Sequence, residues 1–216
     1  MRQRKIKNLD EKLAALSAYI IDDPASLKGR WSEAFGNDKP IYLEIGCGKG
    51  RFITGCATSD PDSNYIGIEG QDSVVLRALE KTEAGKLGNT RFVVQYVNDV
   101  REWFAEGELA GVFLNFSDPW PKDRHAKRRL TYYERLQSYC DIISADGSIR
   151  FKTDNEGLFE FTLEQIEEAG LTIAEMTRDL HKSEFADANI QTEYEYKFAT
   201  CLGKNINYVK ILPCKS

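Results

Sequence analysis

The pattern of apolar and polar positions changes near residue 40 and divides the chain into two parts. Before that point, apolar residues recur at helical spacing over residues 9–19 and 27–35, with a break at Asp22-Asp23-Pro24 between them. We expect two helical segments there, packed on the rest of the molecule, after a basic N-terminal arm. The prediction is an arm and helical extension over residues 1–39 and a main domain over residues 40–216.

In the main domain, short apolar runs alternate with longer amphipathic stretches. The apolar runs predict strands at residues 41–45, 65–69, 90–94, 112–114, 148–151 and 171–176. The stretches between them predict helices at residues 51–59, 72–83, 101–104, 132–143 and 158–169. This alternation predicts βαβ units and a mostly parallel, doubly wound α/β sheet. The tail departs from it, because residues 196–201 and 206–212 both have an extended pattern.

Composition narrows the class of protein. A chain of 216 residues with 42% hydrophobic and 29% charged residues suits one globular domain, and no apolar run approaches the roughly 18 residues needed to cross a bilayer. Five scattered cysteines without a C-x-x-C pair, and only two histidines, argue against a metal site and predict free thiols in a reducing cytoplasm. The net charge of −5 argues against indiscriminate nucleic-acid binding, although a local basic cluster can still act over about 8–10 Å.

A glycine loop follows the first predicted strand of the main domain. Gly46, Gly48 and Gly50 lie between a strand and a helix, where nucleotide-like ligands bind α/β sheets. Their spacing is G-x-G-x-G, which lacks the last glycine of the dinucleotide fingerprint G-x-G-x-x-G. Glu44 can attract the sulfonium and ammonium groups of S-adenosylmethionine (SAM), which has no phosphate. The pattern therefore favours SAM over a dinucleotide.

Acidic and amide side chains follow the next two predicted strands. Glu69 ends the second strand, where a carboxylate can accept both ribose hydroxyls of a cofactor. Asn98 and Asp99 follow the third strand and either contact adenine or cap a helix at residue 101.

The stretch from Asn115 to Arg129 has the most distinctive chemistry. Asp118 follows an apolar strand, and the prolines at 119 and 121 predict a stiff turn around it. A dense basic cluster comes next and is a plausible clamp for phosphates. A rigid carboxylate beside cations suits an enzyme that acts on a polyanion. The alternative is a helix that begins at Asp118 and continues as a solvated charged face.

These residues closely resemble the bacterial tRNA (guanine-N7)-methyltransferases. The resemblance rests on residues 44–52, 65–69, 115–122, 124–129, 151–155 and 192–195. Its D-P-W-P-K…R-H…K-R-R signature is far more specific than the glycine loop. The resemblance implies a Rossmann-like class I SAM-dependent methyltransferase fold and methylation of N7 of guanosine 46 in the variable loop of tRNA. It implies SAM as cofactor, tRNA as partner, no metal, no membrane, a cytoplasmic location, and a monomer or weak homodimer.

The resemblance also assigns roles by position. It implies cofactor contacts at Glu44, Glu69 and Asp118, with Asp118 also the catalytic residue. It implies binding of the target nucleoside by Lys122, Asp154, Thr192, Glu193, Tyr194 and Glu195. It implies RNA contact by Arg124, His125, Ala126, Lys127, Arg128 and Arg129. The chain departs from the family pattern at Cys47, Gly70 and Tyr96. Because Tyr96 stands where an acid often serves the adenine end, Asn98 or Asp99 is expected to substitute for it.

Methyl transfer to N7 of guanine does not require a general base. N7 of guanine carries a free lone pair, so catalysis can be mostly positioning at about 3–3.5 Å, with carboxylates stabilising the positive charge that develops on the ring. Asp118, Asp154 and Glu193 are the candidates, although Asp154 could instead cap the helix that follows it. The alternatives in other classes are an NAD(P)-dependent oxidoreductase and a catalytically silent SAM- and RNA-binding subunit.

Overall fold

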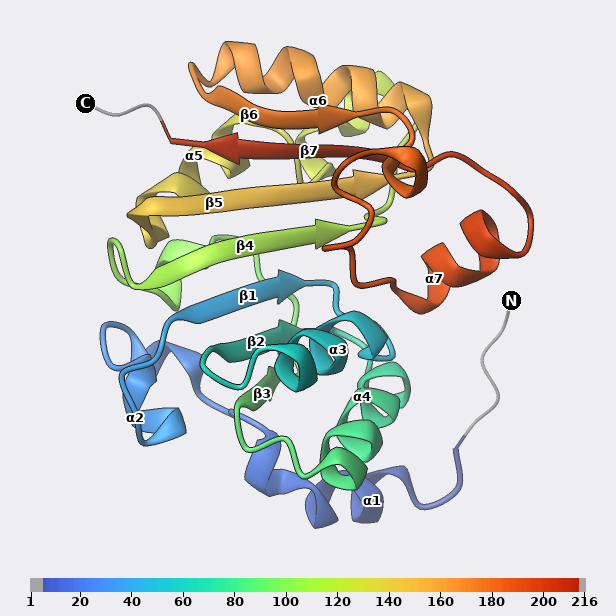
Figure 1. The fold of residues 1–216 in the computed structure, drawn as a ribbon. Helices are drawn as coiled ribbons and strands as arrows, with labels where there is room; N and C mark the ends of the chain where they lie inside the picture. The colour runs from blue at the N-terminus through green and yellow to red at the C-terminus, as the bar shows by residue number, and fades with distance from the viewer. Residues whose placement is uncertain (1–5, 214–216) are drawn as a thin grey trace.

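A seven-stranded sheet forms the centre of the computed structural model, which describes residues 6–213 (Figure 1). Its order is β3-β2-β1-β4-β5-β7-β6. The strands are β1 (Ile41–Ile45), β2 (Asn64–Ile68), β3 (Thr90–Val93), β4 (Leu109–Asn115), β5 (Ile143–Thr153), β6 (Thr172–Thr177) and β7 (Asn207–Leu212). The first five run parallel, whereas β7 is antiparallel to both of its neighbours. The predicted doubly wound, mostly parallel sheet is confirmed.

Helices cover both faces of the sheet (Figure 1). Helices α3 (Arg51–Ser59) and α4 (Asp72–Gly85) pack on one face beside β2 and β3, and α5 (Tyr133–Ile142) and α6 (Glu156–Glu168) pack on the other. The helix predicted at residues 101–104 is a 3₁₀ turn, Val100–Glu102. The extended segment predicted at residues 196–201 is wrong: α7 (Glu193–Glu195) continues there into a π-helix, Tyr196–Thr200.

The N-terminal extension shares the main core. It contains α1 (Leu9–Ala15), two 3₁₀ turns (Ser17–Tyr19 and Pro24–Leu27) and α2 (Trp31–Phe35). Trp31 is fully buried, stacks on Phe104 at 5.0 Å between ring centroids and donates its indole N–H to the Trp103 carbonyl at 2.9 Å. Arg2, Arg4 and Lys5 of the predicted arm lie outside the described residues, and the domain boundary at residue 40 stays a prediction.

The two faces of the central strands differ in chemistry. Side chains such as Leu43, Val112 and Phe151 point to the face under α5 and α6 and are buried in one apolar cluster. The opposite face carries polar and aromatic side chains on the same strands: Tyr42, Glu44, Phe113, Asn115, Arg150 and Lys152. Strands covered on both sides normally read as continuous apolar runs. The polar face therefore needs a functional explanation.

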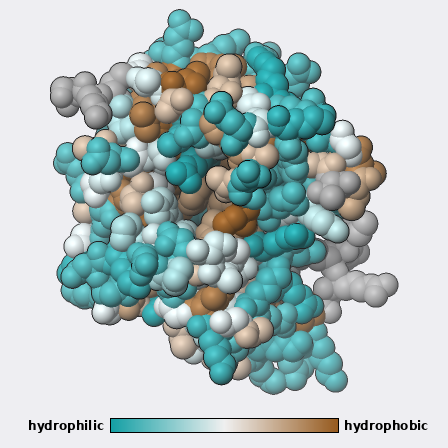
Figure 2. All heavy atoms as spheres, in the orientation of Figure 1, coloured by the Kyte–Doolittle hydropathy of each residue, from teal (hydrophilic) through white to brown (hydrophobic). Residues whose placement is uncertain are grey.

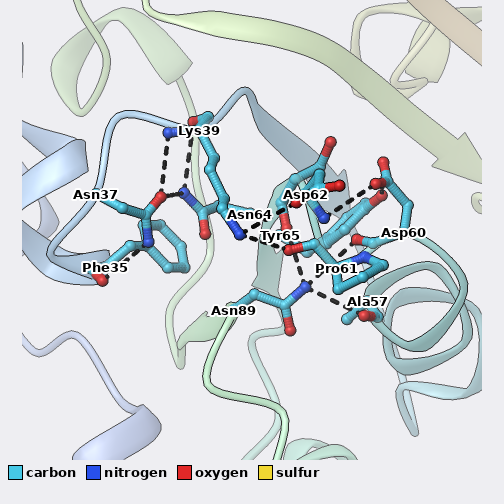
Figure 3. A network of polar contacts seen from close by, with 11 residues as sticks. Phe35, Asn37, Lys39, Ala57, Asp60, Pro61, Asp62, Asn64, Tyr65 and Asn89 are labelled. Carbon is cyan, nitrogen blue, oxygen red and sulfur yellow. Dashed lines mark hydrogen bonds and ion pairs between the residues drawn. The ribbon is translucent and has the colours of Figure 1, made fainter.

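Polar contacts fix the end of the sheet opposite the glycine loop (Figure 3). The Asn89 side-chain amide donates to the carbonyls of Ala57 (3.1 Å) and Ser63 (2.9 Å), which joins the end of α3 to the start of β3. Tyr65 donates its hydroxyl to Asp60 at 3.2 Å in the same region. These contacts hold the C-terminal end of α3 in place. Because the glycine loop leads into the N-terminal end of the same helix, they also help to fix the position of the loop.

Candidate active site

The glycine loop needs its glycines for two different reasons. Gly46, Gly48 and Gly50 all have positive φ, at 79°, 57° and 79°, a region that favours glycine. A Cβ on Gly50 would lie 2.4 Å from the Cβ of Ala78, so this glycine lets α3 approach α4. A Cβ on Gly46 or Gly48 would meet nothing within 4 Å. The first two glycines thus leave open space above the loop, as a ligand-binding turn requires.

Glu44 is a buried acid with one unused oxygen. Its side chain accepts a 2.8 Å hydrogen bond from the Asn115 amide at Oε1, whereas Oε2 has no partner among the described residues. Burial raises the pKa of Glu44 to about 8, even though the Asn115 hydrogen bond and the nearby Lys152 lower it. A cationic ligand would satisfy the unused oxygen. The ammonium of SAM fits this requirement.

Glu69 ties the end of β2 to the glycine loop. Its carboxylate accepts hydrogen bonds from the backbone N–H groups of Gly48 (3.2 Å) and Gln71 (3.0 Å). Burial raises its pKa, although these backbone hydrogen bonds oppose the shift. A cofactor ribose beside the loop would therefore meet a partly desolvated carboxylate, and the ribose contact at Glu69 stays a prediction.

The end of β3 differs from the expectation for the adenine contact. Asp99 accepts from the Arg101 N–H at 3.0 Å and from its guanidinium, so it caps the 3₁₀ turn. Asn98 is exposed, and its carbonyl accepts from Arg135 at 3.2 Å. Tyr96, in contrast, lies on Gly70, where an added Cβ would be 2.3 Å from the ring. The two departures from the family pattern are therefore one feature: the missing side chain at 70 makes room for the ring of Tyr96.

Asp118 sits on a strained turn after β4. The flanking residues Phe116 and Trp120 have positive φ, at 52° and 39°, a conformation that costs a bulky residue about 1–3 kcal/mol. No helix begins at Asp118, so its interpretation as a helix cap is wrong; the next helix is the 3₁₀ segment Asp123–Arg128, called the basic helix below. The Asp118 carboxylate is exposed and has no hydrogen bond or ion pair within residues 6–213. It is available to a ligand.

Arg129 braces this turn from inside. Its guanidinium donates to the carbonyls of Pro119 (3.1 Å) and Trp120 (3.0 Å) and lies 4.1 Å from the ring centroid of Phe161. Only 9% of Arg129 is exposed. This placement revises the predicted RNA contact at Arg129, because its donors already hold the backbone that carries Asp118.

The basic helix presents the other predicted RNA contacts. Arg124, Lys127 and Arg128 are exposed, as is Lys122 just before the helix, whereas His125 and Ala126 are half-buried. Arg128 lies 4.9 Å from the centroid of the Trp120 ring, and His125 packs edge-on against the same ring. The Trp120 ring thus packs against the basic helix, and the cationic side chains of that helix stay exposed to solvent.

The predicted substrate residues Thr192 to Glu195 form the N-cap and the three residues of the short helix α7. Thr192 and Glu195 make a reciprocal capping box. The Glu195 carboxylate is fully buried and binds Lys152 at 2.8 Å and His181 at 2.9 Å. Burial alone would raise the pKa of Glu195, but Lys152 and the surrounding hydrogen bonds lower it overall. The predicted substrate contact at Glu195 is therefore revised: this side chain faces inward and anchors the segment.

Glu193 and Tyr194, in the middle of this segment, contact the start of α3 and the turn that carries Asp118. Glu193 accepts from the Arg51 N–H at 3.3 Å and pairs with Lys81, which places it at the start of α3. Tyr194 packs on Phe116 at 5.0 Å and donates to Asp154 at 3.2 Å. Asp154 also pairs with Lys204 at 3.2 Å, and the cap of α6 is the neighbouring residue, Asn155. The structure therefore brings together Asp118's turn, Asp154 and Tyr194, and rejects the cap interpretation of Asp154.

Comparison with known proteins decides the family. A family described as "Putative methyltransferase" matches residues 38–207. A tRNA (guanine-N(7)-)-methyltransferase from Geobacillus thermodenitrificans is 48% identical over 199 residues, 92% of each chain. Another from Streptococcus sanguinis is also 48% identical, over 92% of this chain and 93% of its own. This chain belongs to the tRNA (guanine-N7)-methyltransferase family. The oxidoreductase alternative is thereby excluded.

Solved structures agree on the fold of this tRNA (guanine-N7)-methyltransferase family member. An antibiotic-related methyltransferase superposes with a TM-score of 0.60 at 17% identity, over 85% of this chain and 92% of the other. A SAM-dependent methyltransferase from Aquifex aeolicus gives 0.53 at 14% identity, over 97% and 100%. The predicted Rossmann-like methyltransferase fold is confirmed.

Other site classes find no support in the part of the chain that the structure describes. No group of three or more His, Cys, Asp or Glu residues there could hold a metal ion. None of its helices is long and apolar enough to cross a membrane.

Proposed function

We propose that the chain transfers the methyl group of SAM to N7 of a guanosine in tRNA, with guanosine 46 of the variable loop as the expected target. The observation that carries this proposal is the Asp118 carboxylate, unpaired within residues 6–213 and held on a braced turn. This turn follows β4, which pairs with β1, the strand that leads into the glycine loop. Glu69 and Asp154 lie on the same side of the sheet, because each directly follows the carboxyl end of a parallel strand, β2 and β5.

The cofactor side of the site uses the carboxyl ends of β1, β2 and β3. Glu44 offers its unused oxygen to the ammonium, and Glu69 accepts from the ribose hydroxyls. We assign the adenine to the exposed face of Tyr96, which is 74% accessible and adjoins Glu69 through Gly70. Bound SAM supplies an electrophilic methyl group.

The guanine side uses carboxylates on fixed supports. Asp118 stabilises the positive charge that develops on the ring as N7 is methylated. Asp154, oriented by Tyr194 and Lys204, belongs to the nucleoside-binding set with Lys122 and Thr192. Glu193 joins this set to the glycine loop, and Glu195 acts as a positioning residue through Lys152.

The RNA side uses the exposed cations of the basic helix. Arg124, Lys127 and Arg128 are proposed to hold phosphates, whose binding is driven by counterion release and needs no net positive charge on the whole protein. His125 and Ala126 support that surface. A cytoplasmic location and a monomer or weak homodimer stay predictions.

One experiment tests the proposal. The protein is incubated with labelled SAM and unmodified tRNA, and nucleosides are analysed after digestion. We expect 7-methylguanosine at position 46. Asp118→Asn should keep folding and tRNA binding but slow single-turnover methylation at saturating tRNA and SAM by about 10²–10³-fold, the scale for losing one preorganised electrostatic partner. No 7-methylguanosine from the wild-type chain would support the silent-subunit alternative.

A further inference from the structure

A second cavity lies on the polar face of the sheet, beside the methyl-transfer site. It has a volume of about 470 Å³ and lies over β1, β4, β5 and β7, between α3 and residues 180–190. Figure 2 shows this face hollowed near its centre, with an apolar patch bordered by hydrophilic side chains. Its size is in the range of small-molecule sites, about 300–1,000 Å³. Two of its lining residues, Asn115 and Lys152, also support the methyl-transfer site through Glu44 and Glu195, whereas Arg150 has no role there.

Nearly every charge on the cavity wall has a partner. Lys152 pairs with Glu195, and Glu175 accepts from Lys210 (2.8 Å) and Tyr208 (2.9 Å). At one end, Asp60 accepts from Tyr65 at 3.2 Å (Figure 3). The two ion pairs cancel their own charges, whereas the Asp60 carboxylate is hydrogen-bonded but keeps its negative charge.

Arg150 is the exception. It is half-buried on β5, opposite Phe113 on one side and Lys210 on the other. Its guanidinium lies 5.5 Å from the Phe113 ring centroid and makes no hydrogen bond or ion pair with any described residue. Glu184, at the rim, is exposed and solvated. Arg150 interacts electrostatically with the Glu175 carboxylate, which is already hydrogen-bonded to Lys210 and Tyr208. The cavity therefore contains one cation whose five fixed N–H donors bond to no described residue.

Flat aromatic rings line the space around this cation. Tyr42 lies between Tyr65 and Phe113, at 5.7 and 5.8 Å between centroids. Across the cavity, Phe185 packs on Tyr208 at 5.7 Å. A guanidinium binds a carboxylate bidentately, and aromatic walls favour a planar apolar body. We propose that this cavity binds a small planar carboxylate, with Arg150 as its anchor.

The cavity wall also continues into the substrate segment. Lys152 donates to the Asn189 side chain and to the Ile190 carbonyl, both at 2.9 Å, just before Thr192. A ligand in the cavity should therefore perturb the backbone amide resonances of residues 189 and 190. This gives a local readout that does not depend on methyl transfer.

The test uses 2-naphthoate as probe and its neutral isostere 2-naphthamide as matched control ligand. Binding is measured by calorimetry and by amide chemical shifts on the full-length protein with S-adenosylhomocysteine present. We expect the carboxylate to bind at least about tenfold more tightly than the amide, the scale of one charge-assisted hydrogen-bonding pair. Arg150→Gln should remove that preference, and Arg150→Lys should retain part of it.

Arg178→Gln is the control variant, because Arg178 also lies over an aromatic ring, that of Phe159, but outside the cavity wall. It should bind 2-naphthoate like the wild type. Unchanged S-adenosylhomocysteine affinity in Arg150→Gln shows that the variant is folded. The proposal fails if 2-naphthoate does not bind, if the preference for 2-naphthoate over 2-naphthamide survives Arg150→Gln, or if S-adenosylhomocysteine competes with 2-naphthoate. None of these results bears on 7-methylguanosine formation.

Discussion

The affinity of the cofactor site for SAM should depend on pH through one buried carboxyl group, that of Glu44. Burial raises the pKa of Glu44 to about 8, so its carboxyl group is mostly protonated at neutral pH. A cation bound at Oε2 favours the carboxylate. At a pH about one unit below this pKa, SAM binding should release close to one proton, and affinity should rise towards pH 8. Calorimetry in buffers of different ionisation enthalpy measures this release, and it should vanish in Glu44→Gln.

The same carboxyl makes folding less stable as pH rises. Its folded pKa of about 8 lies above the ordinary value of 4.5, so the unfolded chain loses this proton first. The contribution of Glu44 to the free energy of unfolding should therefore be largest below about pH 4.5 and decline up to about pH 8. Equal pH dependence in the wild type and Glu44→Gln would contradict the raised pKa.

The pair of Tyr96 and Gly70 gives a test of the adenine site. If the exposed ring stacks on adenine, Tyr96→Ala should weaken binding of S-adenosylhomocysteine by about 1–3 kcal/mol, the usual value for base–aromatic stacking. Tyr96→Phe should keep the affinity. Binding of S-ribosylhomocysteine, which lacks adenine, should not change in either variant. An equal loss for both ligands would instead mean that Tyr96 supports the Glu69 turn.

Individual side chains were only partly predictable. The sequence identified Tyr96 and Gly70 as unusual, but their contact joins two strands and depends on the register of β2 and β3. Likewise, the acidic Thr192–Glu195 segment suggested four substrate contacts, although burial of Glu195 depends on Lys152 from a distant strand.

At the scale of elements, the basic helix and the turn before it have separable roles. Arg124→Ala/Lys127→Ala should weaken tRNA binding and reduce the magnitude of the salt slope by about 0.7–0.9 for each phosphate that the protein no longer neutralises. SAM affinity should stay unchanged, since neither side chain faces the glycine loop. Filter binding across a salt series measures the slope, and an unaltered slope would mean that the exposed cations are only solvated.

Arg129→Met is the matched contrast at the end of the same helix. The change removes the donors that hold the Pro119 and Trp120 carbonyls, and it replaces the guanidinium over the Phe161 ring by an uncharged side chain of similar length. We expect the salt slope to stay unchanged and kcat to fall by about 10–10²-fold, because a small displacement of Asp118 disturbs the reactive geometry. A changed slope with normal kcat would return Arg129 to the phosphate-binding set.

The helix at residues 193–200 shows why one element was predicted wrongly. Alternating aromatic residues around Tyr194 and Tyr196 suggest a strand, yet T-x-x-E is also the sequence signature of a capping box. The structure forms that box, so the chain enters a helix at Thr192. The capping-box signal was present in the sequence, but the prediction followed the alternating pattern of aromatic residues instead.

At the scale of the molecule, the sequence predicted the alternation of strands and helices but not the place of β7. This last strand inserts antiparallel between β5 and β6. Only long-range pairing selects that position, and local patterning carries no information about it. The polar face of the sheet was hidden for the same reason: Arg150 and Glu175 become neighbours in space only after β7 has been placed between their strands.

The N-terminal extension, predicted to pack on the main domain, shares its core with the sheet. The prediction of an appended segment ending at residue 39 suggests that residues 40–216 could fold alone. Trp31, however, fills the core beside Phe104, and Glu108 accepts from the N–H groups of Gly29 and Trp31, both at 2.9 Å. The extension and the sheet should therefore unfold together.

Trp31→Ala should lower the free energy of unfolding by about 3–5 kcal/mol, the range for removing a large buried aromatic side chain. Trp31→Phe keeps a stacking ring but leaves the Trp103 carbonyl without the indole donor, so it should cost about 1–3 kcal/mol. Chemical denaturation followed by circular dichroism measures both. In each variant a single transition should shift as a whole, because the tryptophan belongs to the core shared by both parts. Two separate transitions, with the later one unchanged, would instead show that residues 40–216 form an independent domain.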